Sequence, residues 1–495
     1  MRADDRPNFI FITTDTQSRG MLSCYVERPG VETPNLDRMA REGVLFENAF
    51  TTCPLCTPAR GSWFTGLHPN RHGAIGNELA VSRRVPFLGE LLADHGYEPH
   101  HIGKWHLDAA GYDGGGRADG GFDASSWYDL SNFYDEVGRE GPNRFGGWNR
   151  GLHEIEYCYG HRVADRAIDL LRTTAQDPCF VAVEFDEPHG PYICPPPFRD
   201  RFTMDDIYVP PTRNADLSAK PRLHREYSAY LARLREKPDS ISGYYPKYYN
   251  CNSYVDYEIG RVLDAVRQEA SRPTIVLFTS DHGDHLGAFG LGAKGPTMYD
   301  HTVAVPLIAW SPAFPGGRRI DSLVSSVDIW ATILDLAGAD GVLAGLSRSA
   351  GYDCRSLAGL IRDGAGRASS TDERHAVVME YSRFGIQFEQ CGGFYPIRCI
   401  RTHRYKLVVN LFDTDELYDL DDDPEETANR INDRGLAGQR NELHDRLLEW
   451  QRQTQDLLRG PSWARRHWRP DTTVPFEGLT TTGAKEQWEG WEWQA

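Results

Sequence analysis

A cysteine at position 56 stands in a sequence context that could support nucleophilic chemistry. The stretch TTCPLCTPARG, residues 51–61, places Cys56 before Thr57, which is suited to cap a helix, and Pro58, which fits a first helical position. The free N–H groups at such a helix start favour an anion. Arg60 follows about one turn later, where its guanidinium can fold back over the thiol. The spacing predicts a nucleophile at an anion site.

Cys53 allows a second interpretation, a Cys-x-x-Cys pair with Cys56. A zinc site would need a second pair of ligands, and a redox pair would follow a thioredoxin-like strand without the proline and arginine. Neither context is present, so we expect Cys53 to be a packing residue. A buried cysteine beside a capped helix remains the alternative for Cys56.

Acidic residues follow two predicted buried strands. Asp15 ends the apolar run at residues 8–14, and Asp281 and His282 follow the run at residues 274–280. Ligands bind at the carboxyl ends of strands in open α/β sheets. Each acid alone would more often be a helix cap or a turn residue. Two carboxylates and an imidazole near an anion site nevertheless predict a divalent-cation site.

Cationic residues also follow predicted strands. Lys104 and His106 are two apart in HHIGKWHL, so an extended loop would place both on one side. His189 lies in DEPHGPY and Lys294 in GLGAKGPTMYD. A lone histidine or lysine is more often structural or solvated. Their shared placement after strands predicts that they surround the anion.

The elements that position these residues alternate between helices and buried strands. Helices are predicted at residues 33–43, 87–97, 162–174 and 255–269, and strands at 8–14, 179–185 and 274–281. This order predicts an α/β fold with a large, mainly parallel mixed sheet flanked by helices. Residues 195–245 have no strong period and are expected to form a long loop, either facing the substrate or on the surface.

The pattern of predicted secondary structure changes after about residue 370. Short antiparallel strands and a helix at residues 441–453 indicate a smaller C-terminal α+β domain. We therefore expect a catalytic domain at 1–370, a subdomain with an antiparallel sheet at 371–470 and an arm at 471–495. The arm could dock on the body or on a second subunit, which leaves a homo-oligomer open.

Composition excludes several partners. The 495 residues carry a net charge of −17, which opposes binding to nucleic acid or an anionic membrane. No apolar run reaches the roughly 18–20 residues of a membrane span, and the first residues do not resemble a signal peptide. We expect a cytoplasmic protein whose ten cysteines are mostly reduced.

These motifs together resemble the type I sulfatases of the alkaline-phosphatase superfamily. The resemblance rests on CTPAR, GYEPHHIGKWHL, EPHGPY, TSDHGDHLG and KGPTMYD, and it continues in order to about residue 435. It implies an alkaline-phosphatase-like fold and the hydrolysis of a sulfate ester. The late segment GGFYPIRCIRTHRYKLVVNL is similar to bacterial sulfatases related to heparan N-sulfatases, which implies a sulfated carbohydrate or a sulfamate as substrate.

The resemblance also implies that a maturation enzyme oxidises Cys56 to formylglycine. One hydroxyl of the hydrated aldehyde would attack sulfur, and the other would lose its proton and expel sulfate. An unmodified thiol is only a few per cent thiolate at neutral pH, and its sulfur adduct has no easy internal exit.

Roles carried over from the family fall on the residues already singled out. Arg60 would hold the formylglycine, and His106 would poise the nucleophile or its collapse. Sulfate would be held by Lys104, His189 and Lys294, and the proton for the leaving oxygen would come from His189 or Lys294. The metal ligands would be Asp15, Asp281, His282 and the modified Cys56.

The sequence departs from the family at the expected metal site. It has Thr16 where many sulfatases have a second acid, and His282 where they have asparagine. Ca²⁺ is the expected ion, with Mn²⁺ as the alternative because an imidazole is a softer ligand. Gln17 could replace the missing acid.

Two rival functions remain. One is a phosphonate or phosphodiester hydrolase of the same superfamily, although those enzymes tend to lack the Lys-x-His pair that Lys104 and His106 provide. The other is a non-enzymatic protein that binds sulfated glycans with an unmodified Cys56. A preference for phosphodiesters would favour the first, and an intact thiol would favour the second.

Overall fold

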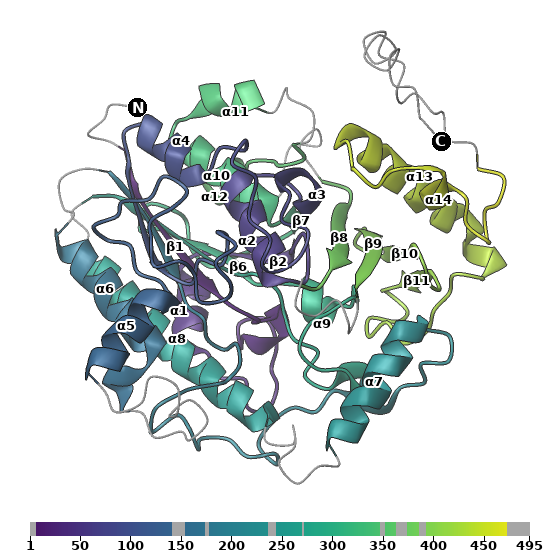
Figure 1. Ribbon diagram of the computed structural model, residues 1–495, viewed down its shortest axis with the longest axis horizontal. Coiled ribbons are helices and arrows are strands. Elements are labelled where there is room, and N and C mark those ends of the chain that lie inside the picture. Colours follow the sequence, from purple (N-terminus) through teal and green to yellow (C-terminus); the bar gives the residue numbers. More distant parts are fainter. Residues whose placement is uncertain are drawn as a thin grey trace, which may run out of the picture.

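A seven-stranded mixed sheet forms the centre of the larger part of the molecule (Figure 1). The computed structural model describes residues 6–140, 154–173, 178–235, 244–269, 272–346, 352–362, 374–385 and 393–472. The strand order is β3-β4-β1-β5-β6-β2-β7, and all neighbours are parallel except that β6 is antiparallel to β5 and β2. The strands are β1 (Asn8–Thr14), β2 (Val44–Phe50), β3 (Glu98–Gly103), β4 (Cys179–Glu184), β5 (Thr274–Ser280), β6 (Leu307–Trp310) and β7 (Arg318–Ser325).

Both faces of this sheet are covered by helices, as the alternation along β1 shows. Phe9 and Phe11 belong to one buried core, and Ile10 and Ile12 belong to the other. The first core includes α2 (Cys56–Thr65), α4 (Leu88–Asp94), α10 (Val327–Leu336), α11 (Asp340–Leu346) and α12 (Ala358–Arg362). The second includes α1 (Pro34–Glu42), α5 (Leu130–Glu140), α6 (Tyr159–Thr173) and α8 (Tyr244–Glu269).

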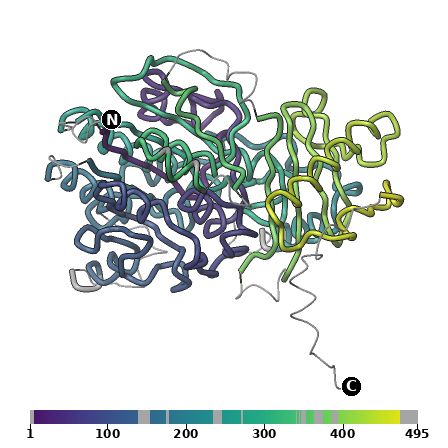
Figure 2. The backbone as a smooth tube through the Cα atoms, turned by 90° about the horizontal axis from the view of Figure 1, so that it is seen from above, coloured from purple at the N-terminus to yellow at the C-terminus, as the bar shows by residue number. Residues whose placement is uncertain are grey.

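A separate four-stranded antiparallel sheet lies beside this body (Figure 2). Its order is β11-β10-β9-β8, from β8 (Val377–Arg383), β9 (Phe394–Arg401), β10 (Tyr405–Asn410) and β11 (Glu416–Asp419). One face packs on Phe50, Cys53 and Leu55 of the larger body. The other face packs on α13 (Ala437–Gln453) and α14 (Pro461–Ala464).

The expected fold class is therefore confirmed: an α/β body with a mainly parallel sheet, followed by a smaller antiparallel α+β part. The boundaries at residues 370 and 470 remain predictions, and most of the expected arm lies outside the described residues. The remaining helices are the short α3 (Pro69–His72) and α9 (Asp300–Val303), and α7 (Arg222–Arg235). No described helix is long and apolar enough to cross a membrane.

Two local predictions were wrong. The segment at 195–245 is not only a loop, because it contains the 14-residue helix α7, in which Leu223, Tyr227 and Leu231 recur at a helical spacing that the prediction missed. Helix α8 begins at Tyr244, well before the expected residue 255. Its added turns are rich in tyrosine, which is a mediocre helix former by propensity, and Tyr248 and Tyr249 are buried by tertiary packing.

Candidate active site

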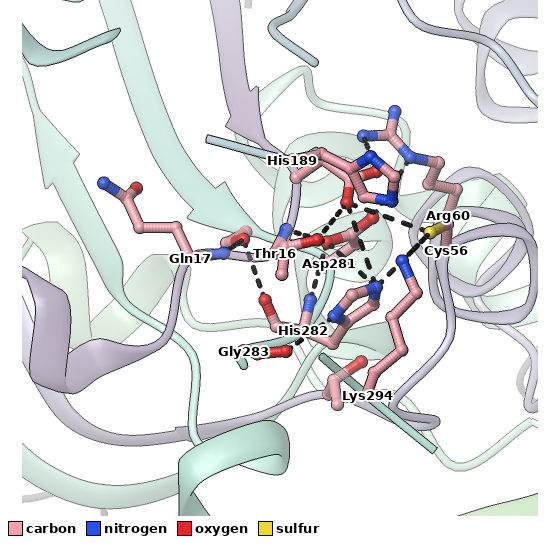
Figure 3. A network of polar contacts seen from close by, with 12 residues as sticks. Thr16, Gln17, Cys56, Arg60, His189, Asp281, His282, Gly283 and Lys294 are labelled. Carbon is pink, nitrogen blue, oxygen red and sulfur yellow. Dashed lines mark hydrogen bonds and ion pairs between the residues drawn. The ribbon is translucent and has the colours of Figure 1, made fainter. Parts of the chain in front are cut away.

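The predicted site residues meet at one edge of the parallel strands. Asp15 directly follows β1, Lys104 follows β3 and Asp281 follows β5, with β4 between β3 and β1 in the sheet. The carboxyl ends of parallel strands lie on the same side, so these side chains converge. Helix α2 brings Cys56 to the same place, as Figure 3 shows.

Helix α2 begins at Cys56 and not at Pro58, which corrects the expected start. Leu55 is the capping residue, with an extended backbone and no side-chain cap. Thr57 lies inside the first turn, and its N–H donates to Asn77 Oδ1 at 3.1 Å. A side chain from a distant part of the chain therefore satisfies the group that local capping was expected to satisfy. The helix ends at Gly66, which has φ of 70°.

Four potential metal ligands form one buried group. One ligand atom from each of Asp15, Cys56, Asp281 and His282 lies within 4.8 Å of the others. Cys56 Sγ is 3.3 Å from His282 Nε2 and 3.8 Å from an oxygen of Asp15. These are the residues predicted as metal ligands, and the group could hold a divalent cation.

The ring of His282 is oriented for ligation through Nε2. Its Nδ1 lies 2.9 Å from the carbonyl oxygen of Gly283, which can only accept, so Nδ1 carries the proton. The lone pair of Nε2 therefore points into the group of ligands (Figure 3). Burial, helped by Lys294, lowers the pKa of His282 to about 3, so the ring is neutral as metal binding requires.

The two carboxylates of this group have opposite pKa shifts. Burial works to raise the pKa of Asp15, but Lys104, His189 and Lys294 outweigh it and hold that pKa well below its ordinary value. Burial and the charge of Asp15 raise the pKa of Asp281 to about 7. Asp281 Oδ2 has no hydrogen-bond partner among the described residues. A divalent cation fits here because it would neutralise two crowded acids and engage that oxygen.

Arg60 is held by carboxylates. It forms a short ion pair with Glu184, and its guanidinium nitrogens lie 3.5 Å from Asp15 Oδ2 and 3.4 Å from Asp281 Oδ2. It also donates to the carbonyl oxygen of Lys104 at 2.9 Å. The arginine thus braces the acids under the site.

Two lysines from separate parts of the sequence contact the group of potential metal ligands. Lys104 Nζ lies 2.7 Å from Asp15 Oδ2 and 2.9 Å from Asp186 Oδ1. Lys294 Nζ lies 3.0 Å from Cys56 Sγ. Both ammonium groups are buried, and although burial opposes their charge, Asp15 and Cys56 help to raise their pKa values. They stay charged and can bind an anion.

The thiol of Cys56 is a weak nucleophile in this setting. Burial and the charge of Asp15 raise its pKa to about 11, against the lowering effect of Lys294 and Lys104. The thiol is therefore protonated at neutral pH. Cys53 is a separate free thiol that packs with Phe50 and Leu55 under the small sheet.

The expectation for Gln17 was wrong. Its side-chain oxygen accepts from Thr14 and its amide nitrogen donates to Asn252 Oδ1 at 2.6 Å, so it turns away from the acids (Figure 3). Thr16 instead serves the carboxylates, because its N–H donates to Asp281 at 2.9 Å and its hydroxyl donates to Asp15. Its φ of 68° makes this double contact possible.

The remaining predicted residues also lie at this site. His106 is buried near Lys104, and its φ of 59° shows that the loop is not extended as expected. Within the part of the chain that the structure describes, both of its ring nitrogens lack a hydrogen-bond partner. His189 contacts Tyr112 and the carbonyl oxygen of Gly190. All predicted site residues thus meet in one place, while their catalytic roles stay predictions.

Sequence reasoning missed four residues of the site: Tyr112, Asp186, Glu184 and Asn77. Glu184 carried a usable signal, since a glutamate in a run of buried apolar residues needs a cationic partner. Asp186 is one residue from the EPHGPY motif. Tyr112 and Asn77 lie in loops, where sequence gives no orientation.

Comparison with known proteins agrees with this geometry. The family model described as Sulfatase matches residues 7–339, and the model described as N-sulphoglucosamine sulphohydrolase, C-terminal, matches residues 287–453. The uncharacterized sulfatase YidJ of Escherichia coli (strain K12) is 36% identical over 492 residues, covering 96% of this chain and 93% of that protein.

Solved structures share the fold. The phosphonate monoester hydrolase of Agrobacterium radiobacter has a TM-score of 0.75 at 23% identity, covering 91% of this chain and 97% of its own. BT4656, solved with its substrate D-glucosamine-2-N,6-O-disulfate, has a TM-score of 0.71 at 22% identity, covering 91% and 99%. The fold, the converging site and the family match together show that this chain belongs to the sulfatase family of sulfuric ester hydrolases.

Proposed function

We propose that this sulfatase releases inorganic sulfate from a sulfated carbohydrate, using a formylglycine at position 56 and a divalent cation. The observation that carries the proposal is the environment of Cys56. A thiol whose pKa is raised to about 11 lies 3.0 Å from Lys294 Nζ and within reach of His282 and Asp15. In such a site a thiol would stay protonated and react poorly. The site suits an oxygen nucleophile bound to a cation.

The residues around position 56 would have separate roles. Asp15, Asp281 and His282 would hold the cation, which supplies charge neutralisation for the nucleophilic oxygen and the sulfate oxygens. Lys104 and Lys294 would bind sulfate oxygens, and Arg60 would keep the acids in place. His106, whose ring nitrogens have no hydrogen-bond partner in the described residues, would hold or move a proton at the hydrated formylglycine.

The donor group favours Mn²⁺ over the Ca²⁺ implied by the resemblance. Ca²⁺ takes six to eight oxygen ligands, whereas this group offers two carboxylates and an imidazole nitrogen, and Gln17 is turned away. Imidazole suits transition metals better than alkaline-earth ions.

The substrate class rests on likeness alone. The model for the C-terminal part of N-sulphoglucosamine sulphohydrolase matches residues 287–453, and BT4656 was solved with a sulfated glucosamine. These relations support a sulfated sugar, without choosing an ester position or a sulfamate.

Two measurements test this proposal. Mass spectrometry of the peptide that contains residue 56, purified from the native host, should show formylglycine; an intact thiol would contradict the mechanism. Sulfate release from a panel of sulfated mono- and disaccharides should exceed release from choline sulfate and aryl sulfates. Indifference to the sugars would contradict the carbohydrate proposal.

The phosphonate hydrolases are the rival because they share the fold. The pair of Lys104 and His106, which those enzymes tend to lack, favours sulfate. Rates on one phenol carried as a sulfate and as a phenylphosphonate decide between them, and a preference for the phosphonate would favour the rival.

A further inference from the structure

The loop that carries Lys294 is held in a constrained shape. Residues 291–299 form neither helix nor strand, and they place Lys294 Nζ 3.0 Å from Cys56 Sγ (Figure 3). Ala293, directly before the lysine, has φ of 54°, which is sterically unfavourable for a residue with a Cβ atom. Such a backbone persists only where surrounding contacts determine it. The position of Lys294 therefore depends on what contacts the backbone of its loop.

Helix α7 contacts this backbone on both sides of the lysine. Tyr227 Oη lies 3.1 Å from the carbonyl oxygen of Gly292, and His224 Nε2 lies 3.2 Å from the carbonyl oxygen of Pro296. A carbonyl oxygen can only accept, so the hydroxyl and the imidazole nitrogen both donate. Gly292 is two residues before Lys294 and Pro296 is two residues after it. The two donors are three apart on α7 and so lie on one face of the helix.

The ring of His224 has the protonation state that this contact needs. Its Nδ1 lies 3.2 Å from the hydroxyl of Tyr299, which can donate to it. Burial lowers the pKa of His224, so the ring is neutral and carries one proton. The acceptor at Pro296 requires that proton on Nε2, and the lone pair on Nδ1 is then free to accept from Tyr299. Both ring nitrogens are therefore used in fixing the loop.

Helix α7 is itself fixed to the small sheet. Asp413, between β10 and β11, accepts from the N–H groups of Arg222 and Leu223 at 3.0 and 3.2 Å. These are the first two residues of α7, whose N–H groups have no partner within the helix. The hydroxyl of Tyr395 on β9 donates to the same carboxylate at 2.8 Å. The helix is thus tied at its start to the small sheet and along one face to the loop of Lys294.

We propose that Tyr227 and His224 are positioning residues: through the carbonyl oxygens of the loop they hold the Lys294 ammonium group beside residue 56, where it binds sulfate. An ammonium group on a flexible four-carbon chain is placed only as well as the backbone that carries it, and a misplacement of about 1 Å in a catalytic site is costly. This inference rests on the proposed function, in which Lys294 binds a sulfate oxygen. It assigns α7, within the segment at 195–245, a role that is carried through the loop.

Inhibition by inorganic sulfate tests the placement of the ammonium group. The inhibition constant of sulfate, Ki, is measured against hydrolysis of 4-nitrophenyl sulfate by the mature, metal-loaded enzyme. Tyr227→Phe removes one hydrogen bond to the loop and should raise Ki about 3-fold, and His224→Leu removes two and should raise it about 5-fold. The double variant should raise Ki at least about 10-fold. A Ki within about 2-fold of wild type in the double variant would overturn the proposal.

Two conservative variants separate the hydrogen bonds from the packing of the helix. His224→Gln keeps an N–H donor near the position of Nε2, so its Ki should return to within about 2-fold of wild type. Equal Ki values for His224→Gln and His224→Leu would contradict a role for the hydrogen bond. Tyr230→Phe is the matched control on the same helix, because Tyr230 is exposed, and it should keep the wild-type Ki.

A variant of the lysine separates positioning from a general effect on the fold. In Lys294→Met the ammonium group is absent, so there is no charge left for α7 to place. Adding Tyr227→Phe and His224→Leu to this variant should raise Ki by no more than about 2-fold further, because residues acting as one unit are not additive. A further rise as large as in the wild-type background would mean that α7 acts on the fold and not through the lysine.

The proposed function can fail independently of this inference. Its failure appears in the wild-type enzyme, as a preference for a phenylphosphonate over the sulfate of the same phenol. The inference fails only in the comparison among variants. If the phosphonate is preferred, the same variants are compared by the Ki of inorganic phosphate against the phosphonate, with the same expected ratios and the same contradicting outcomes.

Discussion

Two groups of buried charges in this protein are built in opposite ways. The active-site cluster comprises Asp15, Arg60, Lys104 and Asp281 at the ends of the parallel strands. The small-sheet network comprises Asn70, Glu380, Arg398 and Asp456, and it joins α3, β8, β9 and the segment after α13. All four residues of the active-site cluster and all four of the small-sheet network are buried.

The small-sheet network leaves little unpaired. Arg398 donates to both oxygens of Asp456 at 2.7 and 3.0 Å, and its Nη2 lies 3.0 Å from Glu380. Its remaining nitrogen donates to the carbonyl oxygens of Tyr381 and Ile397. Burial acts to raise the pKa of Asp456, but Arg398 outweighs it and the pKa is lowered. Among the described residues, Asn70 Oδ1 is left without a partner, but the charged groups are densely paired, and such pairing fixes geometry.

In the active-site cluster, buried charged groups are incompletely paired. Of the residues that the structure describes, only Arg60, at 3.4 Å, pairs with Asp281 Oδ2, and the pKa of Asp281 is raised to about 7 by burial and by Asp15. Buried groups with shifted pKa values are typical of functional sites. Both groups are buried, so it is the incomplete pairing of charged atoms that distinguishes the active-site cluster from the small-sheet network.

The largest effect is expected from Cys56→Ala. Removing the proposed formylglycine precursor should lower sulfate release by at least about 10³-fold, whereas Cys53→Ala should leave most activity because Cys53 only packs under the small sheet. Both are measured as turnover per folded molecule, in a host that converts cysteine to formylglycine. Equal loss from the two variants would restore the Cys-x-x-Cys interpretation.

The next effect is on stability. Arg398→Ala leaves Glu380 and Asp456 buried without their cation, so the free energy of unfolding should fall by about 3–5 kcal/mol, measured by urea denaturation. Turnover per folded molecule should remain. Arg452→Ala, which removes an exposed pair with Glu449, is the control and should change stability by no more than about 0.5 kcal/mol. A similar small change in both would mean that the network is not structural.

A smaller effect is expected for the choice of metal. After chelation, Mn²⁺ should restore sulfate release about 10-fold better than Ca²⁺ at equal concentration, because His282 presents Nε2 to the ligand group. His282→Asn replaces the imidazole by an oxygen donor and should narrow or reverse that ratio. Better restoration by Ca²⁺ in the wild-type protein would contradict the metal assignment.

The sequence predicted the fold class and picked out residues that the structure places together, because strand ends and helix starts are local patterns. Asp15, Lys104 and Asp281 could be placed from the strands that precede them. What could not be predicted depends on distant partners. Asn77 replaces Thr57 in serving the helix start, Gln17 is drawn away by Asn252, and Tyr112 reaches His189 across 77 residues. Such contacts depend on loop conformations that no local pattern specifies.

The smallest effect is a dependence of stability on pH. In the chelated protein the folded state binds more protons at Asp281 than the unfolded chain does, between an ordinary aspartate pKa and about 7. The contribution of Asp281 to the free energy of unfolding therefore falls as pH rises through this range. Asp281→Asn cannot lose a proton, so its stability relative to wild type should grow by about 1 kcal/mol or more from pH 4 to pH 7, measured by urea denaturation at each pH. Saturating Mn²⁺ should remove or reverse this gain, because the ion then stabilises only the ionised carboxylate.

Asp456→Asn is the contrasting variant: the pKa of Asp456 is lowered, so its contribution to the free energy of unfolding is present above the ordinary pKa and is lost only in more acidic solution. If both variants showed the same trend, the proposed difference between the two clusters would be wrong.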